Sequence, residues 1–183
     1  MDTSPRWYAL YTRHQHEKSV ALSLRGKGLE VFLPLYTAVH RWKDRDKRLV
    51  LPLFPCYLFL QNPAERWQPV LATPGVHSVV GFARRPATIP AVEIEAIQRV
   101  VGSCLKLEPH PFLRLGDRVR LRAGPLENLE GLLIRKKSTW KLVVSVEMLQ
   151  RSVAVEVDAT MVEPVGRRTA AVVPDFLSFA ARA

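Results

Sequence analysis

The hydrophobic pattern of the chain changes at about residue 104, and this change limits the folds that the chain can adopt. Before that point, alternating apolar runs are mixed with segments that have the spacing of amphipathic helices. Beyond it the helical spacing disappears, and short Val-rich runs alternate with turn residues. A chain of 183 residues is long enough for two domains. The sequence therefore predicts an α+β domain followed by a small all-β domain.

The N-terminal domain, residues 1–104, is expected to contain an antiparallel sheet covered by three helices. Glycines 26 and 28 end the first helical pattern, and Asn62-Pro63 is a typical cap and first-turn pair for the second. A charged run, HRWKDRDKR, forms the expected tip of a long β-hairpin. The expected elements are a strand at 6–12, a helix starting near 14, a strand at 29–35, a hairpin within 37–61, a helix at 62–71, a strand at 76–82 and a helix at 90–101.

The C-terminal part begins with a segment that has no periodicity. Residues 105–111 contain two prolines and are predicted to be a linker. Residues 112–165 carry about five short strands, the pattern of a small β-barrel. Gly131 precedes one of these strands, and we expect it to allow a bend or a close strand approach that a side chain would block. We expect residues 166–183 to form a C-terminal tail.

The charge of the chain favours a polyanionic partner. Lys and Arg number 27 against 17 Asp and Glu, a net charge of +10. A surplus of this size is typical of proteins that bind nucleic acid. Both halves of the chain are basic, so charge alone does not assign this partner to one domain.

The sequence contains no residue pattern typical of an enzyme, and we expect neither catalysis nor a cofactor. His14 and His16 stand two residues apart at a helix start and therefore face different ways. The histidines and the two isolated cysteines lack the spacing of zinc ligands, so no metal is expected. Isolated thiols, no apolar run of membrane-spanning length and no signal-peptide pattern predict a cytoplasmic protein without membrane contact.

A resemblance to a known family rests on several motifs that occur in order. They are WYALYTRHQHEKSVALSLRGKGLEVFLPL, PLFPCYLFL, TPGVHSVVGF and IPAVEIEAIQ, followed by GDRVRLRAGPLENLEG and LLIRKK. Together they resemble the N-terminal domain and the SH3-like KOW barrel of the NusG family, over residues 6–165. The resemblance is strongest to specialised antitermination paralogues of the RfaH and UpxY type, because PLFP-x-YLF and the charged hairpin occupy the same places. Alternatives are a housekeeping NusG-type factor that couples to Rho or the ribosome, and a ribosome- or RNA-binding KOW protein.

The resemblance implies a monomeric transcription elongation and antitermination factor. It would bind the clamp formed by the largest subunits of RNA polymerase, suppress pausing and raise processivity. Leu58 and Leu60 are expected in the core of the sheet. Family positions that form or border the polymerase-binding patch correspond to Tyr11, Phe54, Pro55, Tyr57 and Ile97.

Further partners also follow from the resemblance. Arg13, with Arg25 and Lys27 nearby, is expected to face the non-template DNA strand of the elongation complex. The KOW domain would recruit ribosomal protein S10 or Rho. The segment PAERWQPV lacks the hydroxyl-rich motif with which RfaH-like proteins contact the polymerase gate loop. Because Val-rich alternation favours strands over helices, we expect the barrel to remain a barrel and to leave the patch open or loosely covered.

Overall fold

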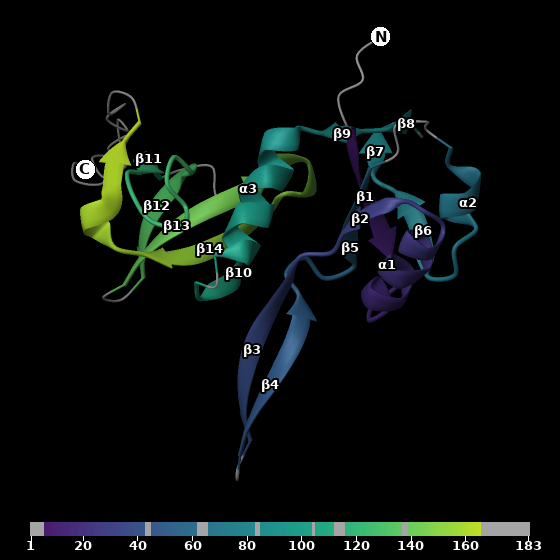
Figure 1. Ribbon diagram of the computed structural model, residues 1–183, viewed down its shortest axis with the longest axis horizontal. Helices are drawn as coiled ribbons and strands as arrows, with labels where there is room; N and C mark the ends of the chain where they lie inside the picture. The colour runs from purple at the N-terminus through teal and green to yellow at the C-terminus, as the bar shows by residue number, and fades with distance from the viewer. Residues whose placement is uncertain are drawn as a thin grey trace, which may run out of the picture.

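The computed structural model describes residues 6–42, 45–61, 66–82, 85–103, 105–111, 116–136 and 139–165. Figure 1 shows two antiparallel sheets, a long hairpin that projects away from both, and a helix, α3, beside the second sheet. This arrangement agrees with the predicted order, in which mixed α and β elements precede an all-β region.

The first sheet is built around β1, in which every residue except Tyr11 is buried. Trp7 and Ala9 belong to one apolar cluster and Leu10 to another, as period-two alternation in a central strand requires. Leu58 and Leu60 are fully buried, which confirms their predicted place in the core. The strands run in the order β2-β5-β1-β6, and β9 also pairs with β1: β1 (Trp7–Thr12), β2 (Glu30–Phe32), β5 (Tyr57–Gln61), β6 (Val76–Val79) and β9 (Thr88–Ile89).

Three α-helices occur among the described residues, as predicted; the first two pack on this sheet, and the second is shorter than expected. In α1 (Glu17–Gly26), the buried residues Val20, Ala21 and Leu24 form one side of the helix and pack on the sheet. The predicted helix at 62–71 is confined to α2 (Gln68–Leu71), and residues 62–65 lie outside the described residues. Pro90 precedes α3 (Ala91–Gly102), whose apolar residues have helical spacing.

The projecting hairpin differs from the prediction in its return strand. Strands β3 (Leu35–Trp42) and β4 (Arg45–Pro52) pair along their full length, with the charged run at the tip. The next apolar run does not continue the hairpin, because the chain turns at Cys56, which has a φ of 67°, and β5 then joins the first sheet. A second, short hairpin consists of β7 (Gly81–Phe82) and β8 (Arg85–Pro86).

The second sheet has six antiparallel strands in the order β10-β14-β13-β12-β11-β15. Gly131 allows the close approach that was predicted, because a Cβ atom there would lie 2.6 Å from the carbonyl oxygen of Val143. Two 3₁₀ turns, at Glu147–Leu149 and Ala159–Met161, connect strands of this sheet. Its strands are β10 (Leu107–Pro111), β11 (Asp117–Leu121), β12 (Glu130–Lys136), β13 (Thr139–Val146), β14 (Arg151–Val157) and β15 (Val162–Pro164).

The predicted linker at 105–111 is wrong for most of its length, since β10 pairs with β14 over all five of its residues. An edge strand tolerates proline, because one side of its backbone has no ladder partner. Lys141 on β13 is almost fully buried and places its Nζ atom 2.8 Å from a carboxylate oxygen of Glu108. This ion pair fixes β10 to the sheet.

Candidate functional site

An aromatic patch lies where β1 and β5 end beside the turn at Phe54–Cys56. Tyr11 and Tyr57 are directly opposite each other in the strand pair, with ring centroids 5.4 Å apart. The Tyr11 ring also contacts the ring of His77 on β6. Tyr11 is 38% exposed, Tyr57 is half-buried and Pro55 is exposed. We call Tyr11, Phe54, Pro55 and Tyr57 the aromatic patch.

We expected the polymerase-binding patch to be open or loosely covered, but two of its predicted members are buried. Phe54 is only 1% exposed and Ile97 is fully buried. Phe54 packs edge-on against Phe59, and a small cavity beside it is lined by residues of both sheets: Leu53, Phe54, Pro55, Pro109, His110, Arg151 and Ser152. The second sheet therefore covers part of the surface on which the sequence places these residues.

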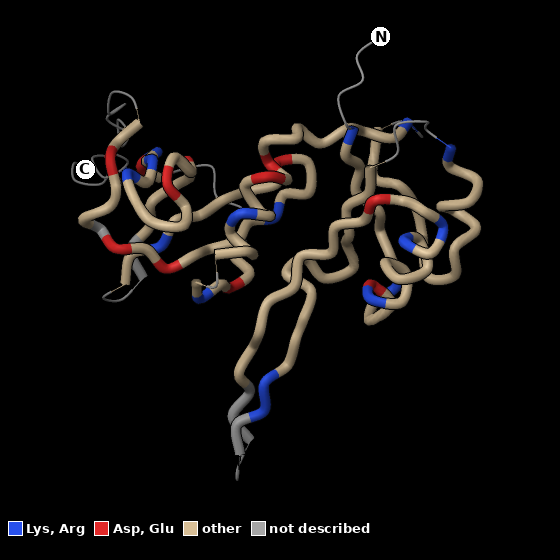
Figure 2. The backbone as a smooth tube through the Cα atoms, viewed as in Figure 1, with Lys and Arg blue, Asp and Glu red and all other residues tan. Residues whose placement is uncertain are grey.

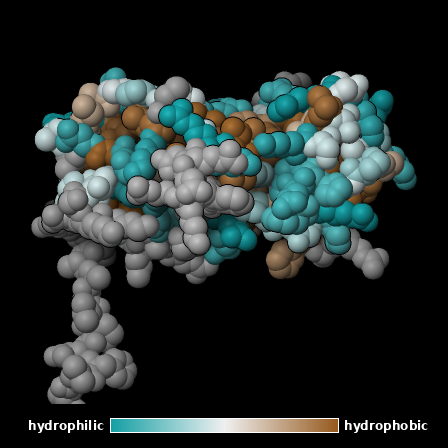
Figure 3. Space-filling view, turned by 90° about the horizontal axis from the view of Figure 1, so that it is seen from below, coloured by the Kyte–Doolittle hydropathy of each residue, from teal (hydrophilic) through white to brown (hydrophobic). Residues whose placement is uncertain are grey.

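Helix α3 accounts for this covering, because its apolar stripe is buried between the two sheets. Ile94, Ile97 and Val100 belong to one continuous core cluster with residues of the first sheet and with Val144 and Val146 of the second. Local periodicity identified the stripe as apolar but contained no information about what would cover it. Figure 3 shows apolar surface over the second sheet and toward its junction with the first sheet. In the same view, the surface over the first sheet is mostly hydrophilic.

Two hydrogen bonds join α3 to turns of the second sheet. The backbone N–H of Glu147 donates to Oε2 of Glu93 at 3.1 Å, and the guanidinium of Arg99 donates to the carbonyl oxygen of Glu127. Burial raises the pKa of the Glu93 carboxyl and the negative charge of Glu147 adds to this, while the hydrogen bond from the Glu147 backbone opposes it. The net effect is a raised pKa, so the junction disfavours the charged form of Glu93.

The three predicted basic residues do not form one cluster. Arg25 donates from Nε and Nη2 to the carbonyl oxygen of Val31, and Nζ of Lys27 donates to Pro69 and Thr73. For Arg13, which is exposed, no side-chain hydrogen bond or ion pair occurs among the described residues. Arg13 precedes α1 and the other two lie at its far end, about 15 Å away along a helix of this length. Figure 2 shows Lys and Arg spread over both parts of the chain.

The structure also brings together three side chains that spacing along the sequence could not connect. His14, Glu17 and Cys56 place one potential ligand atom each within 4.8 Å of one another. The prediction of no metal ligand set rested on local spacing, and Cys56 lies far along the chain from the two others. No nearby sequence signal marks this group. Within the described residues, no helix is long and apolar enough to cross a membrane.

Comparisons with known proteins place the chain in a family. A family model described as transcription termination factor NusG matches residues 5–98. The NusG protein of Thermus thermophilus is 31% identical over 180 residues, which cover 87% of this chain and 98% of that protein. The NusG protein of Pseudomonas aeruginosa is 29% identical over 176 residues, which cover 87% of this chain and 98% of that protein.

A solved structure shows the same fold. The Thermotoga maritima NusG structure, which describes a domain interaction in that protein, superposes with a TM-score of 0.55 at 19% sequence identity. The match covers 89% of this chain and 98% of the other. Ordered motifs, the fold and the extent of these matches agree with the resemblance found in the sequence. The chain belongs to the NusG family of transcription termination and antitermination factors, which are not enzymes.

Proposed function

We propose that this protein is a transcription elongation and antitermination factor that works in the cytoplasm as a monomer. It binds the RNA polymerase clamp, suppresses pausing and raises processivity. The observation that carries this proposal is the aromatic patch, in which an exposed and a half-buried tyrosine ring stand side by side in a NusG-like domain. Aromatic rings that tolerate water are common anchors of protein interfaces.

The proposed binding surface consists of the patch together with Ile97 on α3. Phe54 and Ile97 are buried beneath the second sheet in the structure, so this sheet must move away before they can contact the polymerase. Only the open form would bind with full affinity, and the apparent affinity would scale with its population. The open form of this factor would then suppress pausing, because it binds the elongating state of the polymerase clamp in preference to the paused state.

The proposed domain organisation follows the family. Residues 1–104 form the polymerase-binding domain, and the second sheet is a KOW barrel of the SH3-like type, with β10 as part of it rather than a linker. The barrel would recruit ribosomal protein S10 or Rho once it is released. The PLFP-x-YLF motif and the paired hairpin β3–β4 support a specialised paralogue of the RfaH and UpxY type.

A nucleic-acid contact is proposed for Arg13, with the non-template DNA strand as its partner. Its side chain is exposed and has no partner among the described residues. Arg25 and Lys27 already donate to backbone carbonyl oxygens, so we propose for them at most a supporting electrostatic role. Phosphate contacts of this kind position a protein on DNA and do not read its sequence.

The test measures binding of the full chain to purified core RNA polymerase. Tyr11→Ala and Tyr57→Ala should each weaken binding by about 2 kcal/mol, or roughly 30-fold, as expected for loss of an aromatic anchor. Phe54→Ala is a poorer probe, because removing a buried ring destabilises a core by about 3–5 kcal/mol. The matched control is Phe82→Ala, since Phe82 is 89% exposed and lies on β7, outside the patch.

Two outcomes would count against the proposal. Wild-type affinity in both folded tyrosine variants would remove the patch from the interface. Binding to ribosomes or RNA, with no binding to polymerase, would favour the alternative of a ribosome- or RNA-binding KOW protein. That alternative predicts an affinity that falls steeply with salt, because it would depend on phosphate contacts of the basic second sheet.

A further inference from the structure

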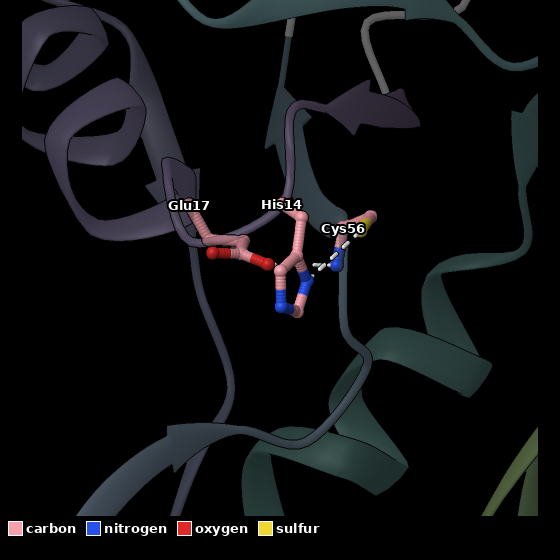
Figure 4. Close-up of side chains that lie close together, drawn as sticks. All are labelled: His14, Glu17 and Cys56. Atoms are coloured by element: carbon pink, nitrogen blue, oxygen red, sulfur yellow. Dashed lines mark hydrogen bonds between the residues drawn. The ribbon is translucent and has the colours of Figure 1, made fainter.

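Three side chains from two distant chain segments converge beside the aromatic patch. His14 lies in the loop between β1 and α1, Glu17 is the first residue of α1, and Cys56 lies in the turn that precedes β5. Their ligand atoms, an imidazole nitrogen, a carboxylate oxygen and a thiol sulfur, lie within 4.8 Å of one another. Figure 4 shows the three side chains close together, one from α1, one from the loop before it and one from the turn before β5. The proposed function does not use this group.

The backbone around the group holds these side chains in place. Oε1 of Glu17, a residue only 3% exposed, accepts a hydrogen bond of 2.8 Å from the backbone N–H of Cys56. The N–H of Thr12 in turn donates to the carbonyl oxygen of Cys56 at 2.8 Å. Cys56 therefore has both backbone polar groups bonded to the segment that carries His14 and Glu17. A site supported in this way needs little rearrangement to accept a ligand.

The spacing of the donor atoms is close to that of a metal site. Sγ of Cys56 lies 3.8 Å from Nδ1 of His14. In a tetrahedral zinc site, bond lengths of about 2.3 Å to sulfur and 2.0 Å to nitrogen place these two atoms roughly 3.5 Å apart. Thiolate, imidazole and carboxylate are the three ligand types that Zn²⁺ binds in proteins. Small side-chain rotations would bring the three donors to bonding distance of one ion.

We propose that His14, Glu17 and Cys56 bind one divalent transition-metal ion, for which Zn²⁺ is the best fit, with a water molecule as the fourth ligand. On binding, the Cys56 thiol releases its proton to solvent and the sulfur bonds to the metal as a thiolate. The bound ion would cross-link the start of α1 to the turn before β5. It would thereby fix the position of Phe54 and Pro55, which immediately precede Cys56 in the chain.

Without a bound metal, the surroundings of Cys56 disfavour the charged form of its thiol. Burial raises the pKa of Cys56, and the negative charge of Glu17 raises it further, while the Arg151 guanidinium on the second sheet opposes this. The same negative charge that disfavours a thiolate attracts a divalent cation. A bound metal would reverse the effect and hold the sulfur deprotonated.

The experiment uses the full chain, stripped of metal with a chelator and titrated with Co²⁺ as a spectroscopic substitute for Zn²⁺. We expect a thiolate-to-cobalt charge-transfer band and visible bands of four-coordinate Co²⁺, saturating at one ion per chain and lost on addition of Zn²⁺. Cys56→Ser should abolish the charge-transfer band. His14→Ala should weaken Co²⁺ binding by at least about 100-fold, because even loss of an outer-shell partner weakens metal binding 10- to 100-fold.

Matched variants separate the site from the other thiol and from a neighbouring imidazole. Cys104→Ser and His16→Ala should bind Co²⁺ as the wild type does. Glu17→Gln keeps an acceptor for the Cys56 N–H and removes the carboxylate charge, so it should fold normally, as judged by circular dichroism, and bind Co²⁺ more weakly. The proposal is overturned if the wild type shows no charge-transfer band, if Cys56→Ser retains it, or if the folded His14→Ala and Glu17→Gln variants bind like the wild type.

Discussion

At the scale of single residues, exposure and bonding partners separate side chains that look equivalent in the sequence. Arg13, Arg25 and Lys27 are all exposed cations near α1. The structure gives Arg25 and Lys27 local acceptors, whereas Arg13 has none among the described residues. A cationic side chain that donates to a backbone carbonyl oxygen stabilises the fold. A cationic side chain without such a partner can instead bind a phosphate.

This difference leads to a prediction about salt dependence. Arg13→Gln should lower the slope of log affinity against log salt by about 0.7 for a contact to single-stranded DNA, without changing the free energy of unfolding. Arg25→Gln should instead lower the free energy of unfolding by about 1 kcal/mol, because the Val31 carbonyl loses its guanidinium donor.

Binding to an elongation complex at several salt concentrations, combined with urea denaturation, distinguishes the two effects. An unchanged slope in Arg13→Gln would show that Arg13 does not contact DNA. A loss of stability in Arg13→Gln would mean that its side chain has a structural role instead.

At the scale of elements, α3 connects the two sheets. Its apolar residues are buried in a cluster shared by both, and Glu93 at its first turn bonds to the turn that follows β13. The raised pKa of Glu93 makes this junction sensitive to pH. Because the pKa is raised in the covered form, that form binds the proton more tightly than the open form does.

The sign of the pH effect follows from this shift. Protonated Glu93 stabilises the covered form relative to the open form. This stabilisation is fully present below the ordinary titration range of a glutamate, and it is lost as pH rises through the raised pKa of Glu93. Glu93→Gln keeps a hydrogen-bond acceptor for the Glu147 N–H but cannot ionise, so it should remove this part of the pH dependence. NMR chemical shifts of the Ile97 and Val144 amides, measured as a function of pH, report whether the second sheet covers α3.

The control is Glu95→Gln on the same helix, whose side chain is exposed. It should retain the wild-type pH profile. If Glu93→Gln also retains the wild-type pH profile, a group other than Glu93 causes the pH dependence of the covered form.

At the scale of the whole molecule, the covering of Phe54 and Ile97 makes polymerase binding depend on the separation of the two sheets. Glu93 and Arg99 each form a hydrogen bond that joins α3 to the second sheet. Both lie at the edge of the junction, so their removal should leave each sheet folded.

We therefore expect Glu93→Ala combined with Arg99→Ala to increase the apparent affinity for RNA polymerase by about tenfold, since more molecules are open before binding. Affinity measurements with core polymerase, alongside Glu95→Ala as the control, test this. Unchanged affinity in the double variant would indicate that the covering sheet does not limit binding.

The amino-acid sequence predicts the type and order of most elements, the core positions of Leu58 and Leu60, the close strand approach at Gly131 and the family. These features depend on residues close together in the chain, whose period and turn chemistry define a strand, a helix or a close approach. They could be predicted because the relevant partners are near neighbours or belong to a recognisable motif.

Three further features became visible in the folded chain: β10 is a strand, Phe54 and Ile97 lie under the second sheet, and His14, Glu17 and Cys56 meet. Each of these depends on contacts between segments that are far apart in sequence. An apolar stripe shows that something must cover it but does not identify the covering element, and a proline-containing segment becomes a strand only when a neighbouring edge is free to pair with it.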